Sequence, residues 1–152
     1  MMYKKHVISP LLMLCLSFAL TACGDDYEDS YAPQYGNMVF NPTRATPGDS
    51  VKVTVEQARL GHGLEKTTYT WSIKYGFLNE EGAVQDTIVT IVQKTNYDGY
   101  PEGHDNPSAR FLVPENCESR QVSVTLNATF SGYIGNTLFL SATKGGTLSV
   151  SY

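Results

Sequence analysis

The stretch QVSVTLNATF, residues 121–130, decides the fold class of this chain. Its apolar side chains stand at every second position, at Val122, Val124, Leu126, Ala128 and Phe130. Successive side chains of a β-strand point to opposite faces, whereas an amphipathic helix repeats its apolar positions every three to four residues. The alternation therefore predicts a strand with one buried face and one solvated face.

Similar runs lie on the N-terminal side of this stretch. Val51, Val53 and Val55 alternate with polar residues, and Tyr69, Trp71 and Ile73 do the same within residues 68–74. Shorter apolar runs predict further strands at residues 38–40, 111–113, 138–142 and 148–150. The segment 86–93 is apolar at Ile88, Val89, Ile91 and Val92, a pattern that predicts a central or covered strand because both of its faces are apolar.

Turn residues separate these runs at intervals of about ten residues. Ala45-Thr46-Pro47-Gly48-Asp49 predicts one turn, and Lys144-Gly145-Gly146 predicts another before the last strand. No segment has a helical period, and a parallel sheet would need helices between its strands. The pattern predicts one all-β domain over residues 37–152, an antiparallel sandwich of about seven to eight strands.

Three segments resemble strands B, C and F–G of bacterial immunoglobulin-like (PKD-like) modules. They are ATPGDSVKVTV (residues 45–55), TYTWSI (68–73) and QVSVTLNATFSGYIGN (121–136). The resemblance implies an immunoglobulin-like β-sandwich with Trp71 over the middle of the core, without the B–F disulfide of antibody domains. A fibronectin-like or transthyretin-like sandwich would give almost the same pattern, so these alternatives stay open.

The N-terminus has the layout of a secretory signal. Lys4 and Lys5 precede the apolar stretch Val7–Leu20, which is too short to span a bilayer. The stretch ends in Leu20-Thr21-Ala22-Cys23, which resembles the lipobox of bacterial lipoproteins. The resemblance implies a signal peptide over residues 1–22 and acyl chains on Cys23, which would anchor the protein to a membrane.

The residues behind Cys23 are predicted to form a flexible linker over 23–36. Gly24–Asp29 holds four acidic residues, a composition typical of a solvated linker. It also resembles the acidic export signal of surface-exposed lipoproteins in the Bacteroidota. We therefore expect a lipid-anchored outer-membrane protein, and leave open whether it faces the surface or the periplasm.

Charge and cysteine content disfavour two functional classes, nucleic-acid binding and catalysis by a cysteine nucleophile. The formal net charge is −4, and removal of Lys4 and Lys5 leaves nine basic and 15 acidic residues, hence −6. An acidic domain without a basic cluster is a poor ligand for nucleic acid. Cys117 is the single cysteine after Cys23, and the acids at 115 and 118 disfavour its thiolate, so we predict a passive, partly buried thiol.

The sequence carries no recognisable catalytic motif. His62 and His104 are the two histidines after the signal segment, and they lie in different predicted loops. Metalloprotease, nucleophile-elbow and phosphate-loop patterns are absent from the sequence. We therefore predict a non-enzymatic protein without a cofactor.

The loop at residues 97–106 holds the remaining candidate site residues. The oxygen ligands of Asp98, Glu102, Asp105 and Asn106 suit Ca²⁺, although the spacing is not that of an EF-hand. The aromatic rings of Tyr97 and Tyr100 could stack on a glycan or enter a partner pocket. An ordinary surface loop has the same composition, and this alternative stays open.

Two functions compete on this sequence. The first is an accessory or structural module, without catalysis, that docks on another protein of the cell envelope. The alternative is a glycan- or ligand-binding module that uses its aromatic loop residues. Asp49-Ser50-Val51 and Asp86-Thr87-Ile88 also resemble the O-glycosylation motif of Bacteroidota envelope proteins.

Overall fold

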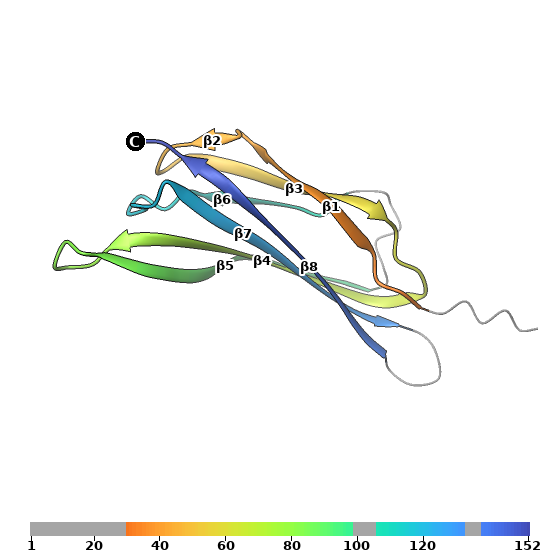
Figure 1. The fold of residues 1–152 in the computed structure, drawn as a ribbon. Coiled ribbons are helices and arrows are strands. Elements are labelled where there is room, and N and C mark those ends of the chain that lie inside the picture. Colours follow the sequence, from red (N-terminus) through yellow and green to blue (C-terminus); the bar gives the residue numbers. More distant parts are fainter. Residues whose placement is uncertain (1–29, 99–105, 133–137) are drawn as a thin grey trace, which may run out of the picture.

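The chain folds into β-strands joined by turns, as a computed structural model shows for residues 30–98, 106–132 and 138–152 (Figure 1). The strands are β1 (Gln34–Asn41), β2 (Arg44–Ala45), β3 (Ser50–Arg59), β4 (Leu64–Leu78), β5 (Val84–Asp98), β6 (Ser108–Leu112), β7 (Gln121–Gly132) and β8 (Leu138–Val150). No helix occurs among these residues. The predicted all-β class is confirmed.

The strands form two sheets. The smaller has the order β1-β3-β6, and the larger has the order β2-β8-β7-β4-β5. Neighbouring strands pair antiparallel, as predicted, except that β2 pairs parallel with the end of β8. The sequence pattern assigned Ala45 to a turn, whereas its backbone runs alongside Val150.

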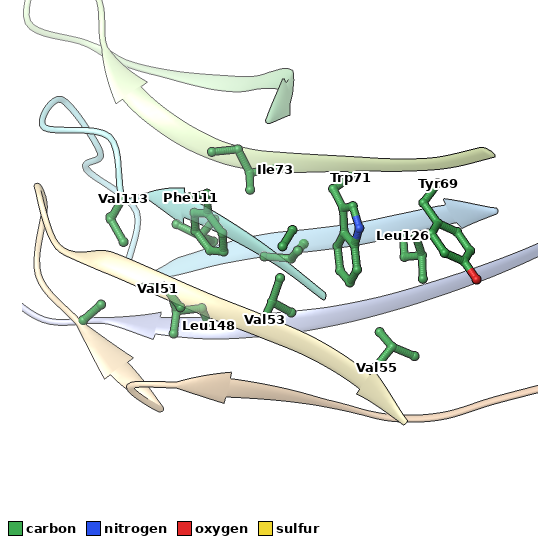
Figure 2. Packing of buried hydrophobic residues seen from close by; sticks show 14 of the residues in the cluster. Val51, Val53, Val55, Tyr69, Trp71, Ile73, Phe111, Val113, Leu126 and Leu148 are labelled. Carbon is green, nitrogen blue, oxygen red and sulfur yellow. The ribbon is translucent and has the colours of Figure 1, made fainter. Parts of the chain in front are cut away.

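The hydrophobic core lies between the two sheets (Figure 2). Val51, Val53 and Val55 of β3 are fully buried and face the larger sheet. From that sheet, β4 contributes Tyr69, Trp71 and Ile73, and Trp71 is only 1% exposed. The buried residues of β7 are the alternating set from which the fold class was predicted: Val122, Val124, Leu126, Ala128 and Phe130. The inward faces of these three strands are therefore confirmed.

The prediction of a central or covered strand at residues 86–93 is wrong. These residues belong to β5, which is one of the two edge strands of the larger sheet. Val89 is 64% exposed and Ile91 is 62% exposed. Val89 pairs with Lys74 and Ile91 with Ser72 of β4, so both side chains lie on the outer, solvent-facing side of the larger sheet. Val92 packs against the core as the extra residue of a bulge, because Trp71 pairs with Gln93 and Ser72 with Ile91.

The turn predicted at Lys144-Gly145-Gly146 is also wrong. Both glycines lie inside β8, paired with Thr125 and Val124 of β7. Gly146 has a packing role instead, because a Cβ atom built on it would lie 2.7 Å from the sulfur of Met38 in β1. The glycine thus lets β1 approach β8 closely.

The structure has a strand and a buried residue before the predicted domain boundary at residue 37. β1 begins at Gln34, and Ser30 is already buried. The predicted linker over 23–36 is therefore too long at its C-terminal end. The composition of residues 30–36 did not reveal the contacts that fix them.

Candidate functional site

One side of the two-layered fold is open, between the edge strands β5 and β6. Neither strand has a partner beyond its own sheet neighbour in the described part of the chain. A hollow of about 440 Å³ lies between them. Its lining comes from β5, from β6 and from the start of β3: Ser50, Thr90, Ile91, Val92, Arg110, Phe111 and Leu112. Together with Val89, these residues define what we call the open edge.

The open edge is apolar with a basic rim. Leu112 is 65% exposed, close to the values for Val89 and Ile91. Arg110 of β6 stands opposite Lys52 of β3 in the register of the smaller sheet. Two cations side by side on a sheet repel each other, and neither forms an ion pair with another described residue. An apolar segment with a nearby carboxylate would match this surface.

A second hollow, of about 260 Å³, lies further along the same two strands. It is lined by residues of β4, β5 and the approach to β6: Tyr69, Trp71, Thr95, Tyr97, Asn106, Pro107 and Ser108. The Tyr97 ring lies edge-on to the Tyr69 ring, with centroids 5.7 Å apart. The side-chain oxygen of Asn106 accepts a hydrogen bond from the backbone N–H of Gln57 (3.0 Å). The lining carries no charged side chain, so the hollow suits a neutral polar ligand.

The structure thus brings together Tyr97 and Asn106 from the predicted loop site. Asp98 lies at the exposed end of β5. Tyr100, Glu102 and Asp105 lie outside the described residues. Within the described ranges, no group of three or more His, Cys, Asp or Glu side chains could hold a metal ion.

Of the two cysteines singled out in the sequence, Cys117 is described by the structure and Cys23 is not. Cys117 is 1% exposed, and its sulfur lies 3.5 Å from both the carbonyl and the hydroxyl oxygen of Ser119. The thiol is thus buried, more completely than predicted. Cys23 lies outside the described residues, and its acylation stays a prediction.

The structure describes the side chains of one of the two candidate O-glycosylation motifs, Asp49-Ser50-Val51. Ser50 is exposed at the start of β3. The preceding Asp49 accepts hydrogen bonds from the backbone N–H (2.7 Å) and the hydroxyl (2.9 Å) of Thr46, and these bonds lower the pKa of the Asp49 carboxyl. Residues 86–88 belong to β5, but their side chains lie outside the described part of the structure.

Residues 30 and 31 are held by contacts that no sequence pattern indicated. The Ser30 hydroxyl donates a hydrogen bond to the carbonyl of Gly63 (2.8 Å). Tyr31 and His62 exchange two backbone hydrogen bonds, of 3.2 and 3.1 Å, and their rings stack with centroids 5.7 Å apart. The Arg59 guanidinium lies 4.1 Å from the centre of the Tyr31 ring. We call these contacts the N-terminal clasp.

Glycines make the clasp possible. A Cβ atom on Gly63 would lie 2.6 Å from the Ser30 hydroxyl oxygen, and one on Gly132 would lie 2.9 Å from the Ser30 Cβ. Gly63 also has a φ of +62°, which favours glycine. The glycines flanking His62 were the available sequence signal, and they indicated only a loop.

Comparisons with known proteins do not place the chain in a family. No family model matches it, and no curated protein matches it. Among solved structures, it is similar to the sporulation control protein Spo0M from Bacillus subtilis, with 13% identity and a TM-score of 0.41. The match covers 80% of this chain and 50% of Spo0M, so the chain spans about half the length of that protein. Over the described residues, no helix has the length and hydropathy needed to cross a membrane.

Proposed function

We propose that this protein is a lipid-anchored, non-catalytic module of the bacterial envelope that docks on another envelope protein through its open edge. The observation that carries the proposal is the exposed, apolar pair of edge strands, β5 and β6. Soluble proteins normally protect or cover exposed sheet edges, because the free N–H and C=O groups of an edge strand pair readily with another chain. A conspicuously apolar edge is therefore a candidate interaction surface.

The order of the strands supports an immunoglobulin-like fold as part of this proposal. The sheets β1-β3-β6 and β2-β8-β7-β4-β5 correspond to strands A-B-E and A′-G-F-C-C′ of that fold. Trp71 lies on the strand equivalent to C, as the resemblance to PKD-like modules implies. In this correspondence no strand D lies among the described residues between β5 and β6, so both are edge strands in the described part of the chain.

The N-terminal clasp gives the anchor a defined reach. Ser30 comes seven residues after Cys23, and an extended chain of that length spans at most about 25 Å. An acylated Cys23 would thus hold the clasped end of the fold close to the membrane. Tethering of this kind raises the effective concentration of the module near membrane-bound partners.

The docking partner is expected to supply an extended, apolar segment that carries an acidic residue. Such a segment can add as a strand beside β6, fill the hollow against Phe111 and Ile91, and place a carboxylate near Arg110. Backbone pairing would supply affinity, and alternate side chains would supply specificity. This mode of docking needs no cofactor.

Site-specific photo-crosslinking in intact envelopes tests the docking. A photoreactive residue at Leu112 is expected to give a discrete adduct with one envelope protein. The matched control is Val39, which is 47% exposed on β1 of the same sheet and lies away from the open edge. Absence of a Leu112 adduct, or identical adducts from both positions, would contradict the proposal.

Glycan binding is the second candidate, favoured by the hollow that holds Tyr97 and Asn106. Its aromatic and amide lining can stack on a sugar ring and bond to sugar hydroxyls. A glycan-array signal that is lost in Tyr97→Ala would favour this function over protein docking.

A further inference from the structure

The middle of β5 is a short regular segment between two irregularities. Its pairing with β4 shifts register between Trp71 and Ser72, and again between Tyr75 and Phe77. Between these shifts, residues 88–91 pair one-to-one with β4. Their other edge faces no strand in the described part of the chain.

The outer face of this segment is apolar. Ile91 stands opposite Ser72 and Val89 opposite Lys74, so both β-branched residues share the solvent side of the larger sheet. Such residues pack well across neighbouring antiparallel strands. A strand added at this edge would cover both of them.

The apolar outer face of β5 can pair with the same face of β5 in a second copy of the chain. Two copies of β5 can pair antiparallel around a twofold axis, in which case directly opposite residues must lie on the same face. An axis at Thr90 places Val89 of each copy opposite Ile91 of the other copy. Residues 89–91 carry no charge, so this pairing places no like charges opposite each other.

We propose that β5 pairs with β5 of a second copy around a twofold axis at Thr90, joining two five-stranded sheets into one continuous sheet. The pairing itself depends only on β5. That the second copy competes with the docking partner for the open edge rests on the proposed function. Self-pairing would then shield the apolar edge until a partner displaces it.

The dimer has a defined relation to the proposed anchor. A twofold axis of this kind reverses the direction of the strands, so the two N-terminal clasps lie at opposite ends of the joined sheet. Each tether reaches at most about 25 Å. Both anchors can enter one bilayer only when the strands of the dimer run along the membrane surface.

Disulfide trapping of the full-length protein in its own membranes tests the pairing. Opposite residues of antiparallel strands have Cα atoms about 4.5–5.5 Å apart, within the range of a disulfide. Under mild oxidation, Thr90→Cys is therefore expected to give a disulfide-linked homodimer that reducing agent dissociates. The wild type, with its buried Cys117, supplies the background.

Asn96→Cys is the matched control on the same exposed strand. The two copies of residue 96 would lie about 40 Å apart in the proposed register, too far to bridge. Adding Val89→Lys and Ile91→Lys to Thr90→Cys is expected to abolish the dimer. Thermal unfolding of each variant checks that the fold is kept.

Several outcomes would overturn the self-pairing. They are no dimer from Thr90→Cys, equal dimer from Asn96→Cys, or a dimer that persists with both lysines. A mixed disulfide between Thr90→Cys and a different protein, with no homodimer, would also overturn it and leave the docking proposal standing. Conversely, a homodimer without any Leu112 adduct would retain the self-pairing and remove the docking.

Discussion

Trp71→Ala is expected to lower the free energy of unfolding by about 3–5 kcal/mol, the range observed when large aromatic residues are truncated in cores. Trp71 is 1% exposed and lies between the two sheets, opposite β3 (Figure 2). Its removal would leave a cavity that the surrounding strands cannot close, because each is fixed in a hydrogen-bonded sheet. Urea unfolding followed by circular dichroism measures the change.

Thr70→Ala is the matched control for this substitution. Thr70 precedes Trp71 on β4 and points to the opposite, outer face of the larger sheet, where it is half-buried. Surface changes of this kind usually alter stability by no more than about 0.5 kcal/mol. Equal losses from both variants, or a negligible loss from Trp71→Ala, would contradict the position of the core.

Gly146→Ala is expected to destabilise the fold by about 1–3 kcal/mol through overpacking. The added Cβ would lie 2.7 Å from the Met38 sulfur, 3.0 Å from its Cβ and 3.1 Å from its Cγ. Rotation of the Met38 side chain can relieve the contact with sulfur. It cannot move the Cβ, so β1 itself must shift away from β8. The midpoint of urea unfolding measures the loss.

The neighbouring glycine supplies the control. A Cβ on Gly145 would meet nothing nearer than the carbonyl oxygen of Val124, at 3.9 Å. Gly145→Ala is therefore expected to be neutral or to stabilise the fold, because alanine restricts the unfolded chain. The double variant Gly146→Ala/Met38→Ala should lose less unfolding free energy than the sum of the two single variants, because residues 146 and 38 lie in contact. Equal effects of the two glycine substitutions would contradict the close approach of β1 to β8.

Side-chain periodicity predicted the buried faces of β3, β4 and β7, because each has one apolar face and no bulge along its buried stretch. The same reasoning failed for β5. There Val89 and Ile91 form an apolar face that stays exposed at the edge of the larger sheet, and the order of the strands leaves no mark in the alternation of apolar residues. It failed again at Gly145 and Gly146, since a glycine that admits a neighbouring strand cannot be told from a turn glycine by sequence.

The candidate site was predictable only in part. Tyr97 was singled out for its aromatic ring and Asn106 as an oxygen ligand for Ca²⁺, and the structure places both in the lining of one hollow. The open edge could not be located, because it depends on the order of strands that are distant in sequence. The clasp was equally hidden, since Ser30 and Tyr31 acquire their partners at Gly63 and His62 only in the folded chain.

The proposed docking at the envelope depends on attachment of Cys23 to lipid, a prediction that mass spectrometry of the protein purified from membranes tests most directly. The mature N-terminal peptide is expected to begin at Cys23 and to carry acyl chains on it, which would anchor the protein durably. In Cys23→Ala the acyl groups should be absent, and the protein should no longer be retained by the membrane through lipid. A protein that keeps Met1, an unmodified Cys23, or equal acyl labelling of the wild type and Cys23→Ala would contradict a lipid-anchored docking module.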